Sequence, residues 1–266
     1  MGIIKQTLNT VKGFVYEFIN SESHHDAFHQ SRENATAWYA EWDDNYMGDF
    51  IGNPITRQFL RTVTDHYYAD QLDEILLQSK ELTKTSYPSF YIVYLGCCEK
   101  LGLYKRPKAY ITSRLQGINA LSIEVKDKRM ILISRRVVIS LTVKEQAFIL
   151  GHELGHHQQG NLVCHTLNGL LDNLNNKTEI IGPIIADAVE VPLKRWCRCS
   201  EFNADRAGII CCGDIEVVKG LFQKLGMCQQ MSAYSEYSEI GSSHPHFQTR
   251  LSALAKYTTV QKLSEL

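Results

Sequence analysis

Two histidines and a glutamate at H-E-x-x-H spacing are the residues best suited to chemistry in this chain. His152, Glu153 and His156 stand in the segment 151–157, GHELGHH. On a helix, residues four apart lie on one face about one turn apart, so both imidazoles can reach a single zinc ion. The Glu153 carboxylate then lies beside the metal, where it can deprotonate a zinc-bound water. The pattern predicts a hydrolytic site with one zinc ion per chain.

A zinc ion held by two histidines needs at least one further protein ligand. Gln159 and Leu162 stand where a metzincin has glycine and histidine, which excludes that arrangement. The downstream candidates are Glu179, Glu190 and Glu201. We favour Glu201, because Asp205 follows four residues later on the same helical face and can hydrogen-bond a ligand imidazole. The alternative interpretation of this pair is a solvated helical face that pairs with Arg206.

The elements that must position these residues make a mainly helical α+β domain with a small sheet. Thr142 and Glu145 form a capping box that begins a helix over 143–159, the helix that carries the histidines. Further helices are expected over 54–78, 91–101, 192–212, 215–225 and 245–257. Strands are expected over 109–112, 118–125 and 130–134, the last two joined by a hairpin turn. Strand 118–125, with Asn119 and Ala120 near its start, is a candidate sheet edge for an extended substrate.

Composition and charge divide the chain into an acidic head and a larger body. The 266 residues include 28 basic and 29 acidic side chains, a net charge of −1, and 44% are hydrophobic. Without a basic excess, nucleic acid is not an expected partner. Residues 1–50 hold 3 basic and 8 acidic side chains, a net charge of −5. We interpret 1–50 as an acidic helical appendage, 51–258 as the domain that carries the zinc motif and 259–266 as a C-terminal tail.

The chain carries no predicted membrane span and no export signal. No stretch reaches the roughly 18 apolar residues that cross a bilayer, and no apolar leader follows Lys5, so a cytoplasmic location is expected. Residues 3–19 place apolar side chains on one helical stripe, which fits either peripheral contact with a membrane or partner, or packing on the domain itself.

His25 and His29 are spaced for a shared metal, but solvated histidines are favoured. The eight cysteines are expected to be free thiols.

Taken together, the motifs resemble the zinc metallopeptidase family of the CAAX prenyl proteases and HtpX-like proteases, in its soluble single-domain branch. The resemblance rests on His152-Glu-Leu-Gly-His156, on Glu201-x-x-x-Asp205, and on His244-Pro245 followed by Arg250, and it covers roughly residues 53–255. It implies a gluzincin-type zincin fold, one catalytic zinc and endopeptidase activity on polypeptides. Asn161 departs from the family pattern, and residues 1–50 have no counterpart in it.

The resemblance also suggests roles for residues near the C-terminus. It implies that His244 stabilises the oxyanion and that Arg250 clamps the helix that carries Asp205. The expected function is therefore a zinc metalloendopeptidase in which Glu153 is the general base. Two alternatives remain: a non-catalytic, zinc-stabilised protein-binding module, which would not need Glu153, and a membrane-surface adaptor that acts through residues 3–19.

Overall fold

The computed structural model describes residues 54–159, 162, 165–166, 182–225, 245 and 247–264. Its helices are α3 (Pro54–Leu77), α4 (Pro88–Lys100), α5 (Arg135–Ser140), α6 (Val143–Gln159), α8 (Gly182–Cys212), α9 (Ile215–Lys224) and α11 (Phe247–Ser264). Its strands are β1 (Ser79–Glu81), β2 (Lys108–Thr112), β3 (Ala120–Val125) and β4 (Lys128–Ser134). The expected α+β class, mainly helical with a small sheet, is confirmed. None of the helices in these ranges is long and apolar enough to cross a membrane.

The four strands form a mixed sheet in the order β1-β2-β4-β3. β2 and β4 run parallel, and the two outer pairs are antiparallel. β3 and β4 are joined by a two-residue turn in which Lys126 and Asp127 have φ values of 50° and 58°. Positive φ at both turn residues is typical of the tight hairpin turn whose twist matches the strands. The expected hairpin is confirmed, and it places β3 at an edge of the sheet.

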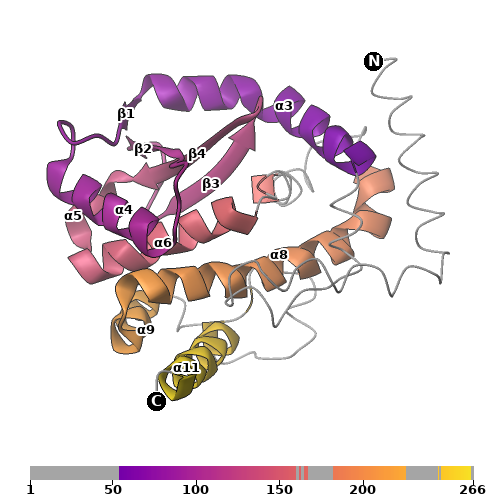
Figure 1. Ribbon diagram of the computed structural model, residues 1–266. Helices are drawn as coiled ribbons and strands as arrows, with labels where there is room; N and C mark the ends of the chain where they lie inside the picture. The colour runs from indigo at the N-terminus through magenta and orange to yellow at the C-terminus, as the bar shows by residue number, and fades with distance from the viewer. Residues whose placement is uncertain are drawn as a thin grey trace.

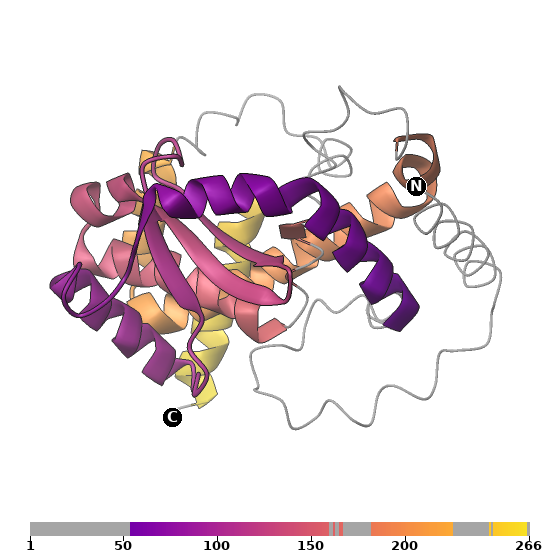
Figure 2. The ribbon, with the colours of Figure 1, turned by 90° about the horizontal axis from the view of Figure 1, so that it is seen from above.

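The sheet lies between two helical layers, with α3 on one face and α6 on the other (Figure 1). Ile131 and Ile133 of β4 share the larger hydrophobic core with Leu154 of α6. Their strand neighbours Met130 and Leu132 share a smaller core with α3. Successive side chains of a strand point to opposite faces, so one strand supplies both cores. Figure 2 shows α3 lying across the face of the sheet that is turned away from α6.

Charged contacts fasten α3 to the β3–β4 hairpin. Glu124 of β3 is buried and accepts hydrogen bonds from Arg61 of α3, at 2.9 Å, and from Arg129 of β4, at 2.8 Å. The main-chain N–H of Lys126 donates to the Asp65 carboxylate of α3 at 2.6 Å. A buried carboxylate is stable only when it is paired in this way. The hairpin end of β3 is therefore held by α3.

Several elements follow the expectations, but α8 and α11 differ in one boundary and two short elements are additional; α11 ends at Ser264, seven residues beyond the expected end at 257. α6 spans 143–159 as predicted, and the Glu145 carboxylate accepts from the main-chain N–H of Thr142 at 2.8 Å, as a capping box requires. α8 begins at Gly182, so the start expected at Pro192 is wrong: the helix continues through this proline. The three-residue strand β1 and the six-residue helix α5 were not expected. The expected helix over 3–19 lies outside the described residues.

α6 and α8 pack against each other closely because glycines on α6 leave no side chain between the helices. A Cβ added to Gly155 would lie 2.9 Å from both the Cα of Ala204 and the Cβ of Ala207 on α8. A Cβ on Gly151 would lie 2.8 Å from the main-chain oxygen of Ala207 and from Cys211. Neither glycine can be enlarged unless the two helices move apart.

We expect Gly155→Ala to destabilise the fold by about 1–2 kcal/mol, because overpacking costs about 1–3 kcal/mol and the gain in helix propensity recovers part of it. Urea unfolding would measure the loss. The matched control is Gly220→Ala on α9, where an added Cβ meets nothing within 4 Å. That variant should be about 0.5–1 kcal/mol more stable than the wild type. Equal behaviour of the two variants would contradict the close packing of α6 on α8.

Candidate metal centre

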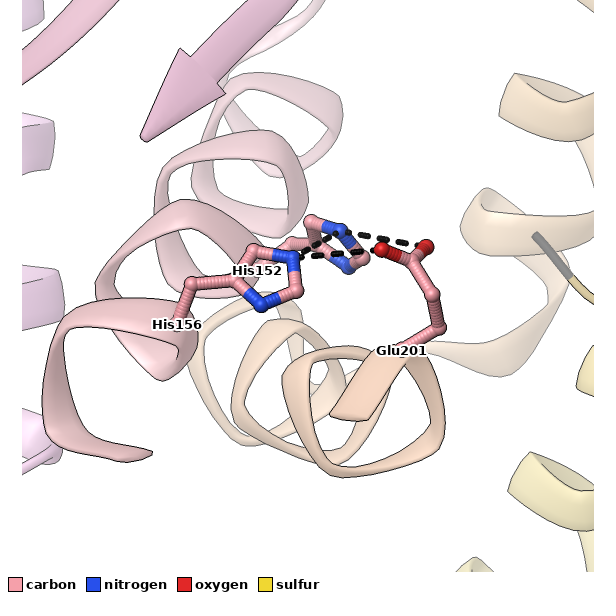
Figure 3. A group of neighbouring side chains, drawn as sticks. All are labelled: His152, His156 and Glu201. Carbon is pink, nitrogen blue, oxygen red and sulfur yellow. Dashed lines mark hydrogen bonds and ion pairs between the residues drawn. The ribbon is translucent and has the colours of Figure 1, made fainter. Parts of the chain in front are cut away.

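The side chains of His152, His156 and Glu201 converge on one point between α6 and α8. Figure 3 shows the two imidazoles of α6 pointing toward the carboxylate of α8. The two histidine Nε2 atoms are 3.1 Å apart. Glu201 lies 3.3 Å from Nε2 of His156 and 3.7 Å from Nε2 of His152. Among the described residues, these three form the group that could hold a metal ion.

The spacing of the three donor atoms fits a tetrahedral zinc ion. Zinc bonds imidazole nitrogen at about 2.0–2.1 Å and carboxylate oxygen at about 2.0–2.2 Å, so neighbouring donors of a tetrahedron are about 3.4 Å apart. The two nitrogens are 3.1 Å apart, Nε2 of His156 is 3.3 Å from Oε1 of Glu201, and Nε2 of His152 is 3.7 Å from Oε2, so each nitrogen lies near that distance from one carboxylate oxygen. Three protein donors leave the fourth position of the tetrahedron open, as catalytic rather than structural zinc sites do. The predicted ligand set therefore fits a catalytic zinc ion.

Asp205 is hydrogen-bonded to the first histidine of the motif. Nδ1 of His152 donates to the Asp205 carboxylate at 3.0 Å, since a carboxylate can only accept. With its proton on Nδ1, the ring presents a bare lone pair at Nε2, which is the form a metal needs. Burial lowers the pKa of His152, but Glu201 and Asp205 outweigh it, and the pKa lies above its ordinary value. This carboxylate-rich surrounding favours a cation at the site.

Arg250 of α11 holds both carboxylates of α8. Its Nε and Nη2 donate to the two oxygens of Asp205 at 2.7 and 2.6 Å, and its Nη1 lies 3.4 Å from Glu201. All three side chains are buried. Burial raises the pKa of Asp205, but Arg250 outweighs it and the pKa lies below its usual range. These contacts join α11 to the helix that carries Asp205.

Glu153 follows the first ligand and is buried against the sheet. Its Oε2 accepts a hydrogen bond from the Ser122 hydroxyl of β3 at 2.6 Å. The same hydroxyl lies 2.9 Å from the main-chain oxygen of Glu153. Sequence reasoning missed Ser122, although one signal was available: in a strand that includes Ala120, residue 122 points to the same face.

A histidine outside the motif also packs on the site. The ring of His165 lies 4.1 Å, centroid to centroid, from the ring of His156. Nε2 of His165 is hydrogen-bonded to the Ser200 hydroxyl of α8 at 2.8 Å. Nδ1 of His156 has no hydrogen-bond partner among the described residues, unlike Nδ1 of His152. Within the described ranges, the contact with His165 is what packs on the ring of the second ligand.

The third histidine of the segment, His157, faces the sheet instead of the metal centre. Burial, followed by the nearby His156 and Arg129, lowers the pKa of His157 to about 3, and its ring hydrogen-bonds the main chain of Met130. His157 is therefore neutral at ordinary pH and adds no positive charge beside the site. Adjacent histidines thus have different surroundings because consecutive helical residues point about 100° apart.

The structure places the remaining predicted residues as follows. Asn119 directly precedes β3 and Ala120 begins it, at the edge of the sheet. Glu190, one of the other ligand candidates, lies on α8 eleven positions before Glu201, and its side chain is not described. His244, the expected oxyanion-stabilising residue, and Glu179 lie outside the described residues.

The described cysteines, finally, are free thiols, and most are buried. They are Cys97, Cys98, Cys197, Cys199, Cys211 and Cys212.

Comparison with known proteins gives one family match and two informative relatives. The model of peptidase family M48 matches residues 93–258. A plastoglobule-localized metallopeptidase 48 from Arabidopsis thaliana chloroplasts is 30% identical over 116 residues, which are 43% of this chain and 34% of the relative. A protease HtpX homolog from Ralstonia nicotianae is 20% identical over 185 residues, 60% of this chain and 63% of the relative. The chain thus spans less than two thirds of either relative. No solved structure gives a significant match.

Proposed function

We propose, from the premise that this chain belongs to peptidase family M48, that it is a zinc-dependent endopeptidase which hydrolyses peptide bonds in polypeptides. The observation that carries the proposal is the convergence of His152, His156 and Glu201 at tetrahedral spacing with one position left open. Glu153 beside this group favours hydrolysis over the zinc-stabilised binding module, because a structural site is closed by four ligands and needs no base.

In the proposed hydrolysis, each side chain around the metal centre has a separate role. A bound zinc supplies a Lewis acid that activates water and polarises the scissile carbonyl. Glu153 accepts the proton that the attacking water loses and delivers it to the leaving amine nitrogen, so no net proton remains on the protein. Asp205 keeps His152 in the tautomer that presents Nε2, and Arg250 keeps Asp205 ionised.

The outer edge of β3, with which no described strand pairs, supports a polypeptide substrate. The main-chain N–H of Ser134 on β4 donates to the main-chain oxygen of Asn119 at 2.8 Å, so the C=O of residue 119 faces β4. Hydrogen-bonded positions alternate along an antiparallel pair, so the N–H and C=O groups of residues 120, 122 and 124 face away from β4. The main-chain N–H of Glu124 donates a hydrogen bond to the Thr166 hydroxyl at 3.3 Å. Ala120 and Ser122, but not Asn119, therefore offer main-chain groups to an extended peptide.

Zinc removal tests the proposed activity directly. We expect the purified chain to carry about one zinc ion and to cleave an unfolded protein into fragments that mass spectrometry identifies. Treatment with a chelator should abolish cleavage, and one equivalent of zinc should restore it. A mock-treated sample is the control for loss of protein during dialysis. A chain that holds one zinc yet cleaves no unfolded protein would instead support the binding module.

The chain outside the metal centre adds further proposals. We propose that residues 51–258 form the peptidase domain and that residues 1–50 are an appendage; the family match at 93–258 lies within the proposed domain. Contact of residues 3–19 with a membrane surface and a cytoplasmic location remain predictions from the sequence. Liposome flotation of the chain with and without residues 1–20 tests the membrane contact, since identical behaviour of the two proteins excludes it.

A further inference from the structure

The hydroxyl of Ser122 lies between the peptide-binding edge and the carboxylate of Glu153. Its side chain points toward α6, where Oγ is 2.6 Å from Oε2 of Glu153 and 2.9 Å from the main-chain oxygen of the same residue. Both side chains are 7% exposed. The contact joins β3 to the centre of the zinc helix, across 31 positions in the sequence.

The main chain of the same residue lies on the outer edge of β3, with which no strand in the described ranges pairs. Because residue 122 is not a hydrogen-bonded position toward β4, its N–H and C=O face the space that an extended peptide would fill. One residue therefore carries two contacts: its main chain meets the substrate strand, and its side chain meets the general base. A shift of β3 relative to α6 would move the scissile bond and the carboxylate by different amounts.

We propose that Ser122 is a positioning residue that fixes the Glu153 carboxylate relative to a peptide bound along β3. The inference rests on the proposed peptidase function and names a part of its machinery. A hydroxyl has one proton, and an ionised carboxylate can only accept, so Ser122 donates to Oε2 and leaves Oε1 of Glu153 for the attacking water. The bond also satisfies a buried carboxylate oxygen that would otherwise lack a partner.

The contact with Ser122 suits the protonated form of the base as well. Once Oε1 of Glu153 has accepted the proton of water, Oε2 is a carbonyl oxygen and still accepts from the Ser122 hydroxyl, so the proton stays on the oxygen that faces the substrate. Ser122 therefore stays hydrogen-bonded before and after the transfer and neither gains nor loses a proton. The carboxyl group keeps its place while it carries the proton to the leaving amine.

The test compares Ser122→Ala and Ser122→Thr with the wild type in the zinc-loaded full chain. For Ser122→Ala we expect kcat on a peptide substrate to fall about tenfold or more, as for loss of a hydrogen bond to a charged group, while KM changes by less than about twofold. KM should hold because main-chain pairing with the substrate does not use the side chain. Ser122→Thr keeps the hydroxyl on a strand position that favours β-branched residues, so most of kcat should return.

Two further measurements separate positioning from a general structural role. Zinc content per chain and the unfolding temperature should stay close to the wild-type values in Ser122→Ala. Binding of the peptide to Glu153→Gln, measured by calorimetry, should be the same with and without the Ser122→Ala change. The matched control is Ser79→Ala on β1, the opposite edge of the sheet, whose hydroxyl donates to the main-chain oxygen of Ile75. It should keep wild-type kcat.

The outcomes distinguish the inference from the function on which it rests. If the zinc-loaded wild type hydrolyses the peptide and Ser122→Ala has the same kcat, the inference is wrong and the proposed function stands. The inference is also wrong if the loss in kcat follows a loss of zinc, or if threonine restores nothing. If the zinc-loaded wild type hydrolyses no peptide, the proposed function fails and this inference fails with it.

Discussion

Replacing Glu153 by Gln should lower kcat by roughly a hundred- to ten-thousandfold, the usual contribution of a general base, while zinc stays bound. Glutamine has nearly the same shape and its amide oxygen can still accept from Ser122, but an amide cannot take up the proton of the attacking water. Zinc should remain because the three converging donors belong to His152, His156 and Glu201. Initial rates of peptide cleavage and metal analysis on the same protein samples measure the two effects.

A surface substitution of the same chemistry provides the control for Glu153→Gln. Glu216 on α9 has a side chain that is 76% exposed, and Glu216→Gln should cleave at the wild-type rate. If Glu153→Gln keeps the wild-type kcat, Glu153 is not the base. If it instead loses zinc, Glu153 takes part in holding the metal, and the assigned ligand set would need revision.

Arg250→Met should destabilise the fold by about 3–5 kcal/mol, the usual cost of removing one partner of a buried ion pair. The substitution keeps most of the side-chain volume but removes the cation that faces Asp205 and Glu201, which are 1% and 2% exposed. Urea unfolding at a fixed zinc concentration measures the change, because bound zinc offsets part of the charge on Glu201. Zinc affinity should fall as well, since Asp205 loses the bonds that fix it beside His152.

Comparison with a surface pair shows whether burial causes the effect of Arg250→Met. Arg114 on the β2–β3 connection pairs with Glu74 of α3 at 3.0 Å, with both side chains about half exposed. Arg114→Met should change the free energy of unfolding by no more than about 1 kcal/mol. Adding Asp205→Asn to Arg250→Met should recover part of the lost stability, because it removes one of the two unpaired charges. Equal losses for Arg114→Met and Arg250→Met would contradict the proposed clamp.

The parts of the fold that sequence reasoning predicted are those with a local physical cause. The capping box at Thr142 and Glu145 marks where α6 begins, and the hairpin turn follows from the charged run Lys126-Asp127-Lys128 between two apolar runs. β1 has the sequence Ser-Lys-Glu, with no apolar alternation, and it is a strand because it pairs with β2. The predicted start of α8 is wrong because a proline at position 192 indicates the beginning of a helix, whereas the helix in fact begins at Gly182 and continues through Pro192.

The same distinction applies to the site. Glu201 could be chosen over other glutamates because Asp205 lies one helical turn away, which is a local relation. The strand pattern can place Ser122 on the same face as Ala120, but it cannot place Ser122 against Glu153, because that contact depends on how a strand packs against a helix 31 positions later. His165 reaches His156 only through tertiary packing, and the motif itself gives no signal for it.

The short free edge of β3 also affects how copies of this chain behave toward one another. Unpaired strands at the rim of a sheet are templates on which a second molecule can add, and long exposed ones lead to aggregation. In the part of the chain that the structure describes, the outer edge of β3 offers main-chain groups at residues 120 and 122 only, because the N–H of Glu124 donates to Thr166 and α3 holds the hairpin beyond it. So short a run can bind one extended peptide segment, but it gives a second copy of the chain too few main-chain hydrogen bonds to continue the sheet.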